Sequence, residues 1–231
     1  MESKPIIDVI IPAFNEENAV GNVVKDIPKE LIREIIVVNN NSTDKTATIA
    51  KNAGATVIEE SAMGYGNACL KGMAHVDLKE IKPSIIVFLD ADYSDYPEEM
   101  IDLIKPILKQ NMDMVIGSRA LGNLEKGAMT PQQVFGNWLA TFLLKLFYGV
   151  KYTDLGPFRA IKYESLVALN MKDKTYGWTV EMQVKAAKQK MKTCEIPVNY
   201  RVRIGFSKVS GTLKGTIGAG YKIITTIFKY L

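Results

Sequence analysis

The amino-acid sequence predicts an α/β fold, a mainly parallel sheet with helices on both faces. Two observations lead to this expectation. Short apolar segments alternate with helix-like segments through the first half of the chain, and polar residues follow three of the apolar segments directly. Because ligands of such sheets bind outside the carboxyl ends of the strands, these polar residues are expected to form a site.

Individual elements follow from composition and local signals. We expect strands at residues 6–12, 34–38, 55–59, 84–89 and 114–116, and helices at residues 15–27, 45–53, 66–75 and 97–110. Most of the strands are almost wholly apolar, which is typical of strands buried on both faces. Ser42, Thr43 and Asp44 carry oxygens that can cap the second helix, and Pro97 suits the first turn of the fourth.

The chain changes character after Gly117. We expect an apolar, aromatic helix at 133–150, a helix at 179–190, a strand at 195–201, a Gly-rich loop at 205–220 and an amphipathic helix at 221–231. The helix at 133–150 is short for a membrane span, which needs about 20 apolar residues. It is therefore expected in a core, in a dimer interface of a homo-oligomer, or along a membrane surface.

Bulk composition points to a globular protein of one domain, residues 1–231. Of the 231 residues 47% are hydrophobic and 23% charged, which is ordinary for a packed domain. Cys69 and Cys194 lie far apart, so neither a disulfide framework nor a metal-binding spacing is present. The N-terminus lacks a signal-peptide pattern, and we expect the protein in the cytoplasm, either free or peripheral on the membrane face.

Positive charge is concentrated near the C-terminus. Residues 182–231 contain ten Lys or Arg and a single acid, Glu195, although the net charge of the chain is only +4. This asymmetry indicates an anionic partner, either phosphate groups or a membrane surface, with a solvated basic face as the alternative. Nucleic acid is not expected, because the basic stretch contains no recognisable binding motif.

Asp90 and Asp92 are the strongest candidates for metal ligands. They directly follow the apolar segment SIIVFL, so two carboxylates lie at the end of a buried strand and can converge on one cation. Mg²⁺ and Mn²⁺ prefer such oxygen ligands and leave positions for water and substrate phosphates. The alternative is a pair of exposed acids in a turn.

Several segments, in order, resemble the family 2 glycosyltransferases of the Rossmann-like GT-A fold. They are VIIPAFNEE, VVNNNSTDKT, GYGNA, FLDADYSDYPEEM and VIGSR. Downstream, YTDLGPFRAI, GWTVEMQVKA and IPVNYRVRIGFSKVSGTLKG resemble the branch of dolichyl- and polyprenyl-phosphate sugar synthases. The resemblance implies a nucleotide-sugar half at 1–119 and an acceptor and lid half at 120–231, the latter an apolar and basic elaboration.

The resemblance assigns a donor site to the first half. Residues in the family's positions for the nucleotide and its diphosphate are Pro12, Phe14, Glu16, Asn39, Gly64 and Asp90. Asn39 stands where the family usually has the first Asp of a DDGS-type motif. Ser94 stands where many members that act on lipid phosphates have Gln. A UDP-sugar is expected in preference to a GDP-sugar, and Asp90 and Asp92 are expected to hold Mg²⁺ or Mn²⁺.

The resemblance also assigns an acceptor site and a lid. Arg119 stands at the family's acceptor-phosphate position, with a structural ion pair to a neighbouring Asp as the alternative. Lid residues expected on the donor and acceptor phosphates are Arg201, Arg203, Ser207 and Lys208. Asp154 is expected either to position the acceptor or to bind Arg159, and with Asp92 and Arg119 it completes the predicted catalytic set.

The implied reaction is an inverting sugar transfer from a nucleotide sugar to a polyprenyl phosphate. A transferase of the same fold that acts on a soluble or glycan hydroxyl is the closest alternative. A nucleotidyltransferase is disfavoured because PAFNEEN, not a Gly-rich basic loop, follows the first strand. A non-catalytic nucleotide-sugar-binding module is disfavoured by the intact Asp pair.

Overall fold

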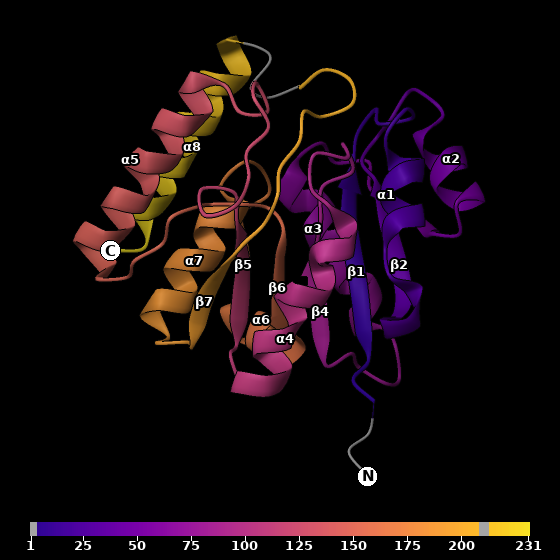
Figure 1. The fold of residues 1–231 in the computed structure, drawn as a ribbon, viewed down its shortest axis with the longest axis horizontal. Helices are drawn as coiled ribbons and strands as arrows, with labels where there is room; N and C mark the ends of the chain where they lie inside the picture. Colours follow the sequence, from indigo (N-terminus) through magenta and orange to yellow (C-terminus); the bar gives the residue numbers. More distant parts are fainter. Residues whose placement is uncertain (1–3, 208–212) are drawn as a thin grey trace.

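The protein is built around one sheet of seven strands (Figure 1), described by a computed structural model over residues 4–207 and 213–231. The strand order is β3-β2-β1-β4-β6-β5-β7. Every neighbouring pair is parallel except those of β6, which runs antiparallel to β4 and β5. The strands are β1 (Ile7–Ala13), β2 (Ile32–Asn39), β3 (Thr56–Glu59), β4 (Ile85–Phe88), β5 (Met114–Ser118), β6 (Arg159–Lys162) and β7 (Thr193–Pro197).

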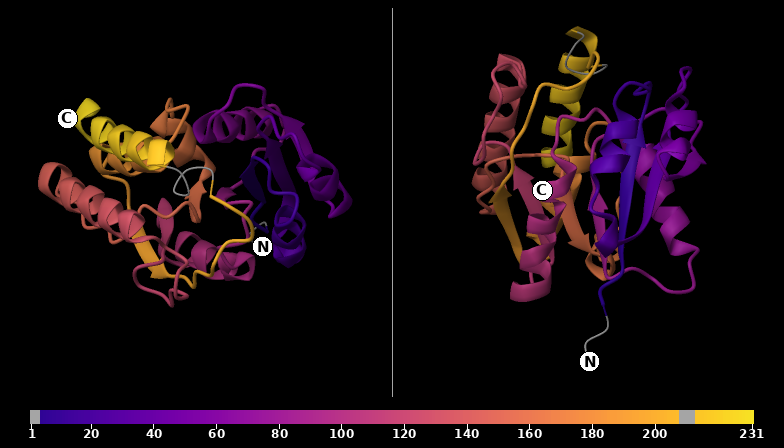
Figure 2. Two further views of the ribbon diagram at one scale, coloured as in Figure 1. Left: turned by 90° about the horizontal axis from the view of Figure 1, so that it is seen from above. Right: turned by 45° about the vertical axis from the view of Figure 1, so that its right-hand side comes forward.

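Helices cover both faces of the sheet (Figure 2), because its central strands are apolar on both sides. On one face side chains of α1 (Val20–Asp26), α2 (Thr46–Asn52) and α4 (Met100–Gln110) join the first core. On the other face lie α3 (Tyr65–Asp77), α5 (Pro131–Tyr148), α6 (Tyr163–Leu169), α7 (Trp178–Lys188) and α8 (Leu213–Lys229). The predicted α/β architecture is therefore confirmed.

The first predicted helix begins later than expected, at Val20 and not at Asn15. The intervening residues form a loop that is tied to the segment after β2. Asn15 has a positive φ of 53°, its backbone N–H donates to Ser42, and the backbone N–H of Glu16 donates to Thr46. These long-range hydrogen bonds replace the local helical ones, and they hold the loop at the edge of the sheet.

The expected loop at 205–220 is wrong over its second half, because α8 begins at Leu213. Glycine costs a helix about 1 kcal/mol per residue, so the local sequence alone opposes this helix. Packing supplies the compensation, since Ile223 and Ile227 belong to the second core and Tyr148 of α5 donates to the carbonyl of Ile227. Tertiary contacts, more than local propensity, determine where most helices form.

Strand β6 and helix α6 were not predicted from the sequence. Their order has a consequence for the site, because an antiparallel strand begins at the edge where its neighbours end. Arg159, the first residue of β6, lies opposite Phe88 of β4 and Ile116 of β5. Residues just before β6, Asp154 among them, therefore come to the same edge as the residues that follow β4 and β5.

Helix α5 confirms the helix predicted at 133–150. Thr130 and Gln133 form a reciprocal capping box at its start, and Pro131 occupies the first turn. Among the described residues, no helix has both the length and the apolar character that a membrane crossing requires.

Candidate active site

The edge at which β1, β2 and β4 end carries a cavity of about 390 Å³. In Figure 1 the carboxyl ends of these strands point toward the top of the view. The lining of the cavity comes from the loops after these strands, from the start of α3 and from two later segments. The lining residues are Pro12, Ala13, Phe14, Glu16, Asn40, Met63, Gly64, Tyr65, Ala68, Asp90, Ala91, Asp92, Thr175, Tyr176, Arg203 and Ser207.

A larger hollow of about 790 Å³ lies near the start of β2. Three of the charged side chains that line it, Arg33, Glu34 and Lys79, are already ion-paired. Arg33 and Lys79 both bond to Asp8, and Lys79 also bonds to Glu34, which accepts a contact from His75. His75 is thus part of a structural ion network. Most of the charged groups at this hollow are already paired and are not available to a ligand.

Asp90 and Asp92 lie side by side in the smaller cavity, in different environments. Asp92 is oriented by Ser94, whose backbone N–H and hydroxyl both donate to Oδ1, at 3.0 and 2.5 Å. Asp90 has a buried Oδ1 with no hydrogen-bond partner among the described residues. Burial, together with the charge of Asp92, raises the pKa of Asp90 to about 7.

These features fit a hard divalent cation. A buried carboxylate oxygen without a partner and a carboxyl pKa raised by a second carboxylate are both relieved when a cation binds. Within residues 4–207 and 213–231 no three Asp, Glu, His or Cys side chains converge on one point. The chain would therefore supply the two carboxylates, and water and substrate phosphates the remaining ligands, as is usual for Mg²⁺.

Arg203 closes one side of this cavity. Its Nη1 lies 3.0 Å from Asp92 Oδ2, and its Nη2 lies 2.6 Å from Glu16 Oε1. The guanidinium thus links the loop after β1 to the loop after β4. Ser207 also lines the cavity, whereas Lys208, the fourth predicted lid residue, lies outside the described residues.

Arg201 has different contacts from Arg203. Its guanidinium carbon lies 3.5 Å from the ring centre of Tyr93 and 4.2 Å from that of Tyr96. Its nitrogens donate to the backbone carbonyls of Tyr93 and Asp95. Arg201 is not among the residues that line the cavity, and its contacts anchor the segment 201–207.

Asn40 lines the cavity, whereas Asn39, the residue predicted to contact the nucleotide, does not. Asn39 is buried and donates to Glu59, and its Oδ1 has no partner among the described residues. Asn40 lines the cavity instead, accepts from the backbone N–H of Gly64 and donates to two carbonyls in the 60–62 segment. Asn40 therefore shapes the loop that forms one wall, a function that its sequence position did not reveal.

Gly64 and Gly66 are required by close backbone packing. A Cβ atom at Gly64 would lie 2.2 Å from the carbonyl oxygen of Lys174, and one at Gly66 would lie 2.0 Å from that of Asp173. Gly64 also has a φ of 138°, a backbone conformation that residues with a side chain rarely adopt. The two glycines let the segment 173–176 approach α3, and this segment contributes Thr175 and Tyr176 to the cavity.

Arg119 and Asp154 form a second polar centre at the same edge. Arg119 donates to both carboxylate oxygens from Nε and Nη2, and its backbone N–H donates to Oδ2 at 2.8 Å. Burial by itself lowers the pKa of Arg119, but the charge and the hydrogen bonds of Asp154, together with Tyr200 and Asp95, raise it. Asp154 is thus bound by Arg119 and not by Arg159, whose guanidinium, among the described residues, donates only to backbone carbonyls.

Asp95 is a buried acid that the sequence did not indicate. It is 2% exposed, and neither carboxylate oxygen has a hydrogen-bond partner among the described residues. Burial, and the negative charges of Asp90 and Asp92, raise its pKa well above the usual range. Glu181, in contrast, accepts bonds from Lys185, Tyr230 and the backbone of the 172–173 segment, and is structural.

Known proteins are similar to this chain over most of its length. The family model for glycosyl transferase family 2 matches residues 8–168. An uncharacterized protein of Methanocaldococcus jannaschii, MJ1222, is 33% identical over 226 residues, which span 96% of this chain and 90% of that protein. A dolichyl-phosphate hexose transferase of Haloferax volcanii is 30% identical over 206 residues, or 87% and 85% of the two chains.

A solved structure shares the fold. Glucosyl-3-phosphoglycerate synthase from Mycobacterium tuberculosis, crystallised with Mn²⁺, UDP and phosphoglyceric acid, superposes with a TM-score of 0.80 at 21% identity, over 99% of this chain and 79% of that one. The fold is therefore of the GT-A type that the sequence predicted. Together with the family match, it follows that the chain belongs to glycosyl transferase family 2 and is a glycosyltransferase.

Proposed function

We propose that this glycosyltransferase moves a sugar from a UDP-sugar to a polyprenyl phosphate at a membrane surface, using a divalent cation held at Asp90 and Asp92. The observation that carries the lipid acceptor is the attachment of α5 to the Arg119–Asp154 centre. Asn137 of α5 donates to the carbonyl of Thr153 and accepts from the N–H of Leu155, so it brackets Asp154 on both sides.

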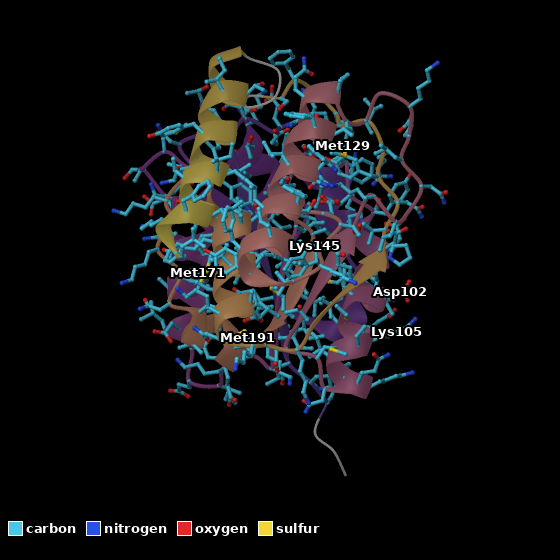
Figure 3. All side chains as sticks on the ribbon, turned by 90° about the vertical axis from the view of Figure 1, so that its left-hand side faces the viewer. Asp102, Lys105, Met129, Lys145, Met171 and Met191 are labelled. Atoms are coloured by element: carbon cyan, nitrogen blue, oxygen red, sulfur yellow. The ribbon has the colours of Figure 1, made fainter. Side chains whose placement is uncertain are left out.

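The outer face of α5 supports a lipid partner. Phe135, Trp138, Phe142 and Leu146 follow one another at helical spacing and are 48–61% exposed. We call these four residues the apolar stripe. Helix α8 packs beside α5 (Figure 3), and its Phe228 contacts Phe147 of α5 edge to face at 5.2 Å.

Charge near the stripe has the sign that anionic lipid attracts. Lys145 lies on α5 and Lys229 near the end of α8, and both are exposed (Figure 3 labels Lys145). An apolar helical face with basic residues beside it is typical of proteins that lie in a membrane interface. A polyprenyl phosphate in that surface would hold its phosphate close to the bilayer plane, next to the residues that α5 supports.

At the acceptor end, Arg119 would bind the phosphate of the polyprenyl phosphate. Its Nε and Nη2 are used on Asp154, and its Nη1 makes no hydrogen bond to a described residue. Asp154 then fixes the orientation of the guanidinium, so that Nη1 is held in one position for the acceptor phosphate. A phosphate acceptor is already ionised near neutral pH, and Asp154 can act in positioning without acting as a base.

At the donor end, the nucleotide would occupy the cavity between the loops after β1 and β2 and the 173–176 segment. UDP is the expected nucleotide. A Mg²⁺ or Mn²⁺ ion at Asp90 and Asp92 would neutralise the charge that develops on the leaving diphosphate. Ser94 keeps Asp92 oriented for this role. The segment 201–207 would exclude water from the reacting atoms.

An acceptor assay tests the proposal. The purified protein, UDP-[¹⁴C]sugars and Mn²⁺ would be incubated with polyprenyl phosphate, with the matching polyprenol, or with 3-phosphoglycerate. Label should enter the organic phase only with the polyprenyl phosphate, because Arg119 requires the phosphate group. Label transfer to 3-phosphoglycerate alone would contradict the lipid acceptor and leave a glycosyltransferase that acts on a soluble substrate.

A further inference from the structure

Arg203 occupies the place that a cation would take on Asp92. Asp92 Oδ1 is used by Ser94, so Oδ2 is the oxygen left for an external ligand. Arg203 Nη1 lies 3.0 Å from that Oδ2. The guanidinium is also held at its other nitrogen by Glu16, while its buried Nε has no hydrogen-bond partner among the described residues.

The backbone fixes this contact. The segment that contains Arg203 runs beside the turn that contains Asp92, because the N–H of Ile204 donates to the carbonyl of Asp92 at 3.0 Å and that of Arg201 donates to the carbonyl of Ser94 at 2.9 Å. The ring pair of Tyr93 and Tyr96 holds Arg201 in addition. The side chain of Arg203 is thus delivered to Asp92 by a segment that is attached on both sides of it.

A divalent ion and this guanidinium would compete for Asp92 and repel each other. Both are positive, both need Asp92 Oδ2, and two cations a few ångströms apart in a partly buried site repel strongly. A diphosphate changes the balance, because its oxygens offer the planar guanidinium a new anionic partner with bidentate geometry. Arg203 can then leave Asp92 without losing its counter-ion.

We propose that Arg203 is an exchangeable counter-ion of Asp92, which moves to the donor diphosphate and so makes metal binding depend on nucleotide binding. The inference rests on the proposed metal-dependent reaction, and adds the order in which the site fills. In the ligand-free protein Arg203 competes with the metal. Once the nucleotide has drawn Arg203 away, both carboxylates are open, so each ligand raises the affinity of the other by the same factor.

The test measures Mn²⁺ binding directly, without reference to catalysis. The electron paramagnetic resonance signal of free Mn²⁺ would be titrated with wild-type protein, Arg203→Gln and Arg203→Lys, each with and without UDP. Thermal unfolding of each variant would establish that it is folded. Lysine keeps a positive charge that can reach Asp92, and glutamine does not, so the pair isolates the effect of charge at this position.

For the wild type we expect weak Mn²⁺ binding alone and binding about tenfold or more tighter with UDP, within the usual range of coupling between two sites. Arg203→Gln should bind Mn²⁺ alone about tenfold more tightly than the wild type and lose most of the UDP effect. Arg203→Lys should bind Mn²⁺ alone as weakly as the wild type.

Equal Mn²⁺ affinity in the wild type and Arg203→Gln, both without UDP, would overturn the exchange while leaving the metal site in place. Equal gains in the Gln and Lys variants would overturn it too, because then charge on Asp92 is not the cause. Absence of Mn²⁺ binding in every form, with or without UDP, would instead overturn the metal site itself, and with it the proposed function.

Discussion

Arg119 and Asp154 form a bidentate ion pair, with nitrogen–oxygen distances of 2.6 and 2.7 Å. This pair joins the end of β5 to the segment before β6. A lysine carries the same charge but cannot make two parallel bonds. Arg119→Lys should therefore lower kcat/KM for the acceptor about 100-fold, the scale of a small misplacement of a binding group. Steady-state kinetics with varied acceptor and saturating donor measure this loss.

Arg33→Lys is the matched control for that experiment. Arg33 makes the same kind of bidentate ion pair, with Asp8, but it does not line the cavity that contains Asp90 and Asp92. Its kinetic constants should stay near those of the wild type. If both variants lost activity equally, the loss would reflect general destabilisation, and Arg119 would have no special role toward the acceptor.

Asp95 should make the stability of the ligand-free protein depend on pH. Its pKa is raised in the folded state by burial and by Asp90 and Asp92, whereas the pKa of an Asp in the unfolded chain is about 4. The folded state therefore holds this proton more tightly. The resulting stabilisation is fully present below about pH 4 and is lost as the pH rises through the folded pKa.

Asp95→Asn removes that dependence. At pH 8 the variant should be more stable than the wild type, by about 1–3 kcal/mol, the usual cost of a buried group left without partners. The difference should shrink toward zero near pH 4. Urea unfolding at a series of pH values checks the trend, and a gain that is the same at every pH would contradict a titrating Asp95.

Gly66 should tolerate no side chain. A Cβ atom there would lie 2.0 Å from the backbone oxygen of Asp173, so Gly66→Ala must displace the segment that carries Thr175 and Tyr176. We expect a loss of about 1–3 kcal/mol in the free energy of unfolding and weaker binding of UDP. Chemical denaturation and a UDP titration measure the two effects.

Gly136→Ala provides the control for the glycine substitution. Gly136 lies within α5, and an added Cβ would meet nothing within 4 Å. Alanine favours a helix over glycine by about 1 kcal/mol, so this variant should be slightly more stable than the wild type. Equal destabilisation of Gly136→Ala and Gly66→Ala would contradict close packing as the cause of the loss at Gly66.

The apolar stripe should bind anionic vesicles. Replacing Trp138 and Phe142 by Ser removes two large apolar side chains from the exposed face of α5, each worth roughly 1–3 kcal/mol when buried. Flotation with phosphatidylglycerol-containing vesicles at low salt should fall at least about tenfold. Leu78→Ser, which changes an 86% exposed residue outside α5 and α8, should float like the wild type. Equal flotation of all three proteins would argue against the stripe as the membrane contact.

The sequence was sufficient to predict the parallel core and the edge that carries the site, because both follow from local patterns. SIIVFL is apolar enough for a strand buried on both faces, and the polar residues after it can only lie at its carboxyl end. The order of these segments then led to the family. Strands β1 to β5 and most helices were predicted for the same reason.

What could not be predicted depends on contacts between distant residues. The pairing of Arg119 with Asp154 requires β6 to run antiparallel, and the short segment RAIK carries no sign of its direction. In the sequence Asp95 resembles any other acid in a turn, and its burial depends on the fold that places it opposite Tyr200. The start of α8 depends on packing against α5 and α7, which outweighs its glycines.

The proposed sugar transfer depends on a metal ion held by Asp92. The most direct measurement is the initial rate of label transfer from a UDP-[¹⁴C]sugar to polyprenyl phosphate, by wild-type protein and Asp92→Asn, in Mn²⁺ and in EDTA. We predict that EDTA abolishes transfer by the wild type, that Mn²⁺ restores it, and that folded Asp92→Asn stays at least about 100-fold slower, as expected when charge stabilisation is lost. Full activity in EDTA, or an unimpaired Asp92→Asn enzyme, would contradict the account.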